Sequence, residues 1–138
     1  MSSSKRQIAA LLIGTFLFSL SGCGRISIDY DGAAVLRYSE KQAWAADKKD
    51  VIQTLTEEET SSVKAFLSSG KHIPTEVGCP FTEDISIAFG GQVFAVAWDG
   101  CPTVRLTNSD NTHEYYKISE EGWDYITALF EKYADYSE

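Results

Sequence analysis

The clearest hydrophobic pattern lies on both sides of Gly90-Gly91. Large apolar residues alternate with small or polar ones before and after this pair, and a two-residue glycine turn between alternating runs predicts a β-hairpin. With that turn Phe89 lies opposite Gln92 and Ile87 opposite Phe94. One face then collects the large residues Ile85, Ile87, Phe89, Phe94, Val96 and Trp98 and is expected to meet the core. The other face is small and thinly covered, with Ser86, Ala88, Ala95 and Ala97.

Further strands and two helices follow from the same kind of pattern. Asp99-Gly100 predicts a turn, after which Thr103 to Thr107 form a third strand with Val104 and Leu106 pointing inward. Two other segments predict a strand, a helix cap and a helix, with Thr56 and Glu59 as a capping box in the first. Ser119 caps the second. The helices carry apolar stripes: Val63, Phe66 and Leu67 in the first, and Trp123, Ile126, Leu129, Phe130 and Tyr133 in the second.

These elements together predict an α+β domain. We expect an antiparallel meandering sheet with two amphipathic helices packed on one face, because each helix has one apolar side that must be buried. The segment from Glu40 to Lys49, which contains Trp44, fits either a strand or a helix.

The start of the chain has a different pattern. Lys5 and Arg6 precede an uncharged apolar run from Ile8 to Leu20, which is shorter than the ~20 residues of a membrane-spanning helix. A charged start, an apolar run and small residues are typical of a secretory signal. The run ends in Leu20-Ser21-Gly22-Cys23, which resembles the lipobox of bacterial lipoproteins. An uncleaved anchor, or an ordinary signal with a spare cysteine, are the alternatives.

The lipobox resemblance implies a location and an anchor. In lipoproteins the chain is cut before the cysteine, whose thiol carries two acyl chains such as palmitate, and two chains hold a protein stably on a membrane. For this chain the resemblance implies lipid on Cys23 and a place on the extracytoplasmic face of a membrane in the bacterial envelope. Gly24, in a position where Asp favours inner-membrane retention, favours the outer membrane if the host has two.

The resulting organisation has three parts. We expect a removed signal peptide at 1–22, a lipid-anchored N-terminus and possible tether at 23–32, and a single domain at 33–138. Ile26, Ile28 and Tyr30 alternate up to Asp31-Gly32, so this segment also fits a strand of a hairpin that returns through Val35, Leu36 and Tyr38.

Charge narrows the range of partners. The chain has 20 acidic and 12 basic residues, a net charge of -8, and loss of Lys5 and Arg6 with the signal peptide moves this to -10 (-8 minus 2). Such a surface is repelled by phosphate backbones and anionic head groups, so we expect no nucleic acid and a membrane contact through the lipid alone. A basic protein partner is compatible with it.

The cysteines point to a disulfide. With Cys23 assigned to lipid, Cys79 and Cys101 remain, and an even pair in an exported protein predicts a bridge. It would tie the long segment before the hairpin to the turn before the third strand.

Candidate catalytic and ligand residues are few. His72 and His113 are the only histidines, and no serine lies in a G-x-S-x-G motif, so we predict no enzyme. Asn108, Asp110, Thr112 and Glu114 are similar to the first half of a calcium loop, but the loop glycine is missing and the twelfth position is Ser119. We therefore predict a hairpin loop, with no metal and no cofactor. Tyrosines favour interfaces, and the candidates are Tyr115, Tyr116 and Tyr136.

The sequence favours a non-catalytic envelope lipoprotein that binds or scaffolds another envelope or secreted protein. An inhibitor or immunity protein against a secreted basic enzyme or toxin is the first alternative, and a small-ligand carrier or enzyme is the second.

Overall fold

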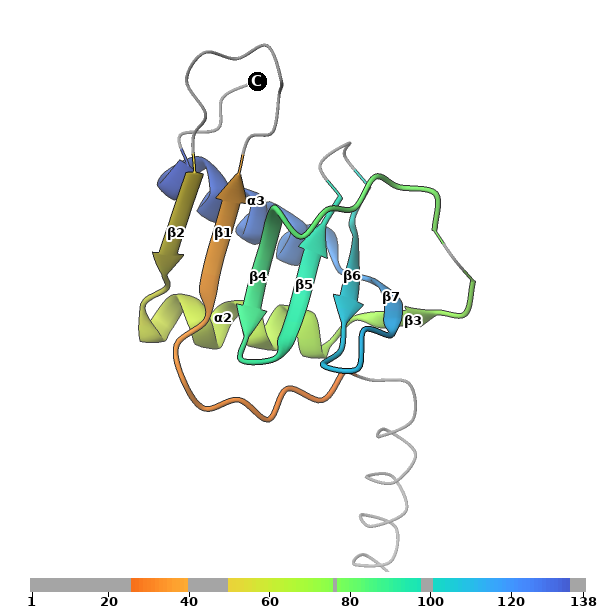
Figure 1. The fold of residues 1–138 in the computed structure, drawn as a ribbon. Coiled ribbons are helices and arrows are strands. Elements are labelled where there is room, and N and C mark those ends of the chain that lie inside the picture. Colours follow the sequence, from red (N-terminus) through yellow and green to blue (C-terminus); the bar gives the residue numbers. More distant parts are fainter. Residues whose placement is uncertain (1–25, 40–49, 76, 98–100, 135–138) are drawn as a thin grey trace, which may run out of the picture.

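The computed structural model describes residues 26–39, 50–75, 77–97 and 101–134, so Cys23, Tyr136 and the segment 40–49 lie outside the described residues. The elements form a seven-stranded antiparallel sheet and two helices (Figure 1). In chain order they are β1 (Val35–Ser39), β2 (Asp50–Thr54), α2 (Glu57–Ser68), β3 (Lys71–Ile73), β4 (Ile85–Phe89), β5 (Gln92–Val96), β6 (Thr103–Thr107), β7 (His113–Lys117) and α3 (Glu120–Ala134). The predicted α+β class is confirmed.

The sheet meanders only through its middle. The strand order is β2-β1-β4-β5-β6-β7-β3, so β4 to β7 follow one another while β1 and β2 join on one side and β3 on the other. The predicted hairpin register is confirmed, with Phe89 paired to Gln92 and Ile87 to Phe94. The third strand has Val104 and Leu106 in the core, as predicted. The expected meander is therefore present from β4 to β7 and does not include β1, β2 and β3.

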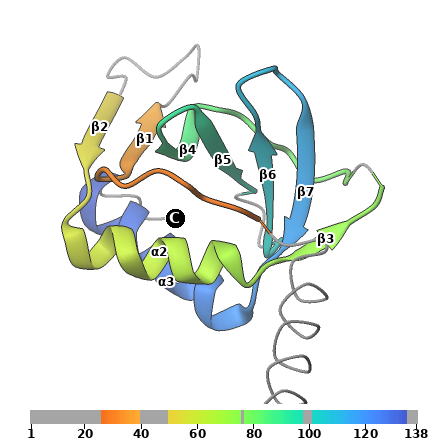
Figure 2. The ribbon, with the colours of Figure 1, turned by 90° about the horizontal axis from the view of Figure 1, so that it is seen from below.

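The two helices run antiparallel to each other. Figure 2 shows both on the same side of the strands, and in Figure 1 α3 passes behind them. α3 approaches β1 and β2, whereas α2 packs against α3 and borders the end of the sheet. The helices meet closely where a Cβ at Gly122 would lie 3.0 Å from the Phe66 ring. Their predicted apolar stripes supply Val63, Leu67, Ile126 and Phe130 to the core.

The caps at the helix starts form as the sequence predicts. Thr56 accepts a hydrogen bond from the Glu59 amide, and the Glu59 carboxylate accepts one from the Thr56 amide, which completes the capping box. Ser119 Oγ accepts a hydrogen bond from the Gly122 amide at the start of α3. Both caps satisfy amides that a helix leaves without intrahelical partners.

The chain from Ile26 to Ala34 is packed without being a strand. Ile26 and Ile28 are buried in the core, so the packed part of the domain begins before residue 33, earlier than the expected boundary. The predicted strand through Ile26, Ile28 and Tyr30 is wrong, because this segment crosses the ends of the strands (Figure 1). Side-chain donors fix it there: Gln92 Nε2 donates to the Ser27 carbonyl at 3.0 Å.

A carboxylate joins the start of α2 to the end of α3. Besides its capping bond, Glu59 accepts hydrogen bonds from Tyr133 Oη at 2.7 Å and Lys132 Nζ at 3.0 Å. Burial raises the pKa of Glu59, but the bonds from Thr56, Tyr133 and Lys132 outweigh it and lower the pKa to about 2. Among the described residues, no helix has the length and apolar character needed to cross a bilayer.

Candidate protein-binding face

The sheet has an inner face toward the helices and an outer face, and the two differ in side-chain size. The inner face carries the large core residues such as Leu36, Phe89 and Phe94. The outer face of β4 and β5 carries Ser86, Ala88, Val93 and Ala95. This agrees with the small second face that the alternation predicts.

One half of the outer face is covered by the chain itself. The segment 77–84 enters β4 over the upper ends of the strands in Figure 1, and its Phe81 ring lies 5.8 Å from the Arg105 guanidinium and 5.7 Å from the Tyr115 ring. The predicted disulfide is confirmed: Cys79 and Cys101 are bridged, with their Cα atoms 6.8 Å apart. The bridge therefore holds the covering segment beside the start of β6.

The other half of the outer face is open and forms a shallow groove. We call it the outer groove; its volume is about 200 Å³ and it is lined by Val35, Arg37, Ile52, Glu83, Ser86, Ala88 and Val93. Its floor is low because Ser86 and Ala88 have short side chains, while Ile52 rises at its border. Ile52 is 71% exposed, and with Tyr30 it is one of the two exposed large hydrophobic side chains among the described residues.

Register explains why these residues meet. Arg37 of β1 pairs with Ile52 of β2 on one side and with Ser86 of β4 on the other, so all three side chains point to the outer face. Val35 pairs with Ala88 in the same way one step along. The groove thus combines strands that are far apart in the sequence, and β2 forms the outermost edge of the described sheet.

Charges of both signs border the outer groove. Arg37 lies 3.6 Å from the Asp84 carboxylate, and Glu83 lines the groove beside that pair. The Arg37 side chain is 49% exposed, so water weakens this ion pair and it contributes little to stability. It provides a polar rim around an apolar centre, which is the usual anatomy of a protein interface.

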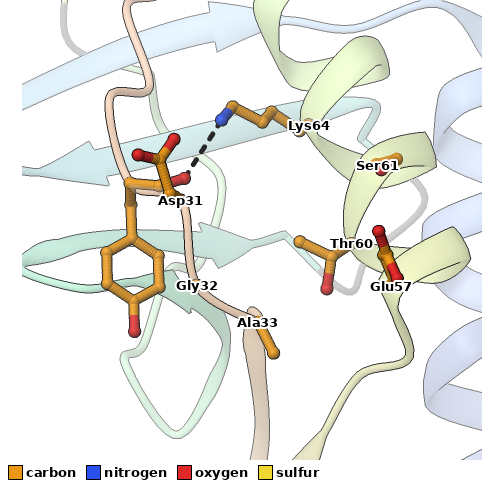
Figure 3. Close-up of a pocket in the computed structure, with 8 residues that line it drawn as sticks. Asp31, Gly32, Ala33, Glu57, Thr60, Ser61 and Lys64 are labelled. Carbon is orange, nitrogen blue, oxygen red and sulfur yellow. Dashed lines mark hydrogen bonds between the residues drawn. The ribbon is translucent and has the colours of Figure 1, made fainter.

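A second, more polar pocket lies between the N-terminal segment and α2 (Figure 3). Its volume is about 250 Å³, and its lining is Tyr30, Asp31, Gly32, Ala33, Glu57, Thr60, Ser61 and Lys64. Lys64 Nζ donates to the Tyr30 carbonyl at 3.0 Å, and Thr60 Oγ1 accepts from the Ala34 amide at 3.1 Å. These bonds hold the N-terminal segment on α2. The polar groups of the pocket that make them therefore have a structural role.

The loop similar to part of a calcium site is held by its own hydrogen bonds. Asp110 Oδ1 accepts from Thr112 Oγ1 at 2.6 Å and from the Thr112 amide at 3.1 Å, and these bonds lower the pKa of Asp110. Asn108 Nδ2 donates to Thr112 at 3.1 Å and to Glu114 at 3.3 Å. In the described part of the chain, no three His, Cys, Asp or Glu side chains form a group that could hold a metal ion.

The two candidate interface tyrosines that the structure describes, Tyr115 and Tyr116, do not line the outer groove. Tyr116 is buried in the core, so its selection as an exposed interface residue was wrong; burial raises its pKa, and nearby Glu114 raises it further. Tyr115 is partly covered by Phe81. The two tyrosines differ in burial because neighbouring side chains along β7 point to opposite faces of the sheet.

Both histidines have structural contacts. His72 lies in β3 and meets the Tyr116 ring edge-on at 5.4 Å. His113 Nδ1 and Thr107 Oγ1 are 3.0 Å apart, which is a hydrogen-bond distance.

Comparison with family models, curated proteins and solved structures finds no match for this chain.

Proposed function

We propose that this protein is a lipid-anchored, non-catalytic module of the bacterial envelope that binds another protein through the outer groove. The observation that carries the proposal is Ile52, which is 71% exposed at the border of a groove floored by Ser86 and Ala88. Leaving such a side chain in water gives up roughly 2 kcal/mol that burial against a partner would recover.

The backbone supports the same surface. Among the described residues, β2 pairs only with β1, so its other side forms an edge of the described sheet. A partner strand can add to such an edge through main-chain bonds while its side chains enter an adjacent pocket. Ile52 and the outer groove are the nearest apolar features to that edge.

The anchor is part of the proposal because of the sequence at Cys23. A charged start, an apolar run and Leu20-Ser21-Gly22-Cys23 support cleavage and acylation there. Metabolic labelling with an alkyne analogue of palmitate checks it: label should enter the wild type and should be lost in Cys23→Ser. Equal labelling of both proteins would refute the anchor.

The binding surface is tested by placing a charge in it. In cells, the tagged protein is cross-linked and purified from solubilised envelopes, and co-purifying proteins are compared among wild type, Ile52→Asp and Thr54→Asp. Thr54→Asp is the matched control, because it adds the same charge on the same exposed face of β2 but does not line the groove.

The proposal expects one specific result. A partner should be recovered with the wild type and with Thr54→Asp, and should be lost with Ile52→Asp. Since Ile52 is exposed, the substitution should leave the circular dichroism spectrum and the unfolding midpoint close to those of the wild type. Recovery of the same proteins with all three chains would refute the outer groove as the binding surface.

A further inference from the structure

We infer that the domain is held directly against the bilayer with one particular end, which we call the proximal end. It consists of residues 26–33, the Gly90-Gly91 turn and the loop 108–112, the end from which Figure 2 is viewed. The inference rests on the proposed acylation of Cys23 and adds to it an orientation and a contact surface.

The first step is the length of the tether. Ile26 is buried in the core, and Gly24 and Arg25 alone separate it from Cys23. Three extended residues span at most ~10 Å. A domain of this size is roughly 30 Å across, so the tether is far shorter than the domain. Only surfaces close to Ile26 can therefore reach the head groups.

The second step identifies those surfaces. Ser27 is bonded to Gln92 beside the Gly90-Gly91 turn, and a Cβ at Gly91 would lie 3.6 Å from Ser109 of the neighbouring loop. The N-terminal segment and both connections thus share one end of the sheet. The covering segment with the Cys79–Cys101 bridge belongs to the opposite ends of the strands (Figure 1).

The third step is independent of the tether. Tyr30 is 41% exposed, and its ring lies over Gly90, where an added Cβ would approach it to 2.9 Å. The other exposed large hydrophobic side chain of the described residues, Ile52, serves the outer groove. A tyrosine with an apolar ring and a wet hydroxyl suits the boundary between head groups and water.

Charge defines the kind of lipid surface. Asp29, Asp31 and Asp110 are exposed at the proximal end. Anionic head groups would repel these carboxylates within a Debye length of about 8 Å. The surface therefore fits a zwitterionic phospholipid, and contact is enforced by the acyl anchor and assisted by Tyr30.

The experiment measures which end of the lipidated full-length protein is near the lipid. Cys79 and Cys101 are bridged and Cys23 would carry lipid, so an introduced cysteine is a unique labelling site. A fluorophore is attached either at Ser109→Cys, in the loop 108–112 of the proximal end, or at Thr82→Cys, in the covering segment at the opposite end. Both positions are exposed. The proteins are reconstituted in phosphatidylcholine and phosphatidylethanolamine vesicles that contain a head-group quencher.

We expect the quencher to reduce the fluorescence of the label at position 109 and to leave the fluorescence of the label at position 82 unchanged. A flexible Gly/Ser insertion of twelve residues between Gly24 and Arg25 should remove the difference, because it adds an end-to-end distance of about 20 Å. Flotation of the vesicles tests the acyl anchor separately from the orientation of the domain. Failure of the wild type to float would overturn the anchor and the orientation together. Flotation with equal quenching at both positions would overturn the orientation alone.

Discussion

Replacing Glu59 with Gln tests whether a buried carboxylate fastens the two helices. Glu59 is 9% exposed and accepts bonds from the Thr56 amide, Tyr133 and Lys132, so it links the start of α2 to the end of α3. Gln keeps the size and one acceptor oxygen. It loses the charge and turns an amide group toward the lysine ammonium.

The magnitude follows from the pKa of Glu59, which lies at about 2 instead of 4.5. A shift of this size corresponds to about 3 kcal/mol of stability from the ionised form. Lys132 is 59% exposed and screened by water, so we expect Glu59→Gln to cost roughly 2 kcal/mol at pH 7. Because the folded-state pKa of Glu59 is lowered, its contribution is complete above pH 4.5 and is lost as the pH falls toward 2. The stabilities of wild type and variant should therefore converge in acid.

The assay is urea unfolding followed by far-ultraviolet circular dichroism between pH 7 and pH 2.5. Glu58→Gln is the matched control, since Glu58 lies in the same first turn, is exposed, and should contribute only about 0.5 kcal/mol through the helix dipole. Equal losses for the two variants at pH 7, or a constant difference between wild type and Glu59→Gln down to pH 2.5, would refute the reasoning.

Two other changes should also reduce stability. Gly122→Ala places a methyl group 3.0 Å from the Phe66 ring at the helix crossing and should cost about 1–3 kcal/mol in urea unfolding, whereas Gly78→Ala, with nothing within 4 Å, should change little. Equal effects would contradict close packing at Gly122. Replacing Cys79 and Cys101 together with Ser opens a link across 22 residues and should cost about 3 kcal/mol, checked by thermal unfolding beside the reduced wild type. Unchanged midpoints would show that the bridge contributes nothing.

Local patterns in the sequence predict most of the elements. The hairpin register at Gly90-Gly91, the capping box at Thr56 and the cap at Ser119 all depend on residues a few positions apart, so they can be read from the chain. β3 was missed because three residues carry no usable alternation. The alternation at Ile26 and Ile28 misled for another reason: both are buried, but in a segment that crosses the strand ends.

The outer groove could be predicted only in part. The small face of Ser86 and Ala88 is visible in the sequence, and the structure confirms it. The position of Ile52 is not, because it depends on β1 inserting between β2 and β4. The Glu59 contacts with Lys132 and Tyr133 also depend on the tertiary arrangement. They could not be predicted because they join residues more than 70 positions apart.

The outer groove and the proximal end could be in contact with a protein and with the membrane at the same time only because of how the sheet would stand on the membrane. If the proximal end rests on the head groups, the strands point away from the bilayer and the outer groove opens sideways, clear of the lipid. The covering segment and its disulfide then lie farthest from the membrane, where Phe81 closes the other half of the outer face. A protein that binds Ile52 would then approach from the side, and it would have to extend to within roughly 30 Å of the membrane surface.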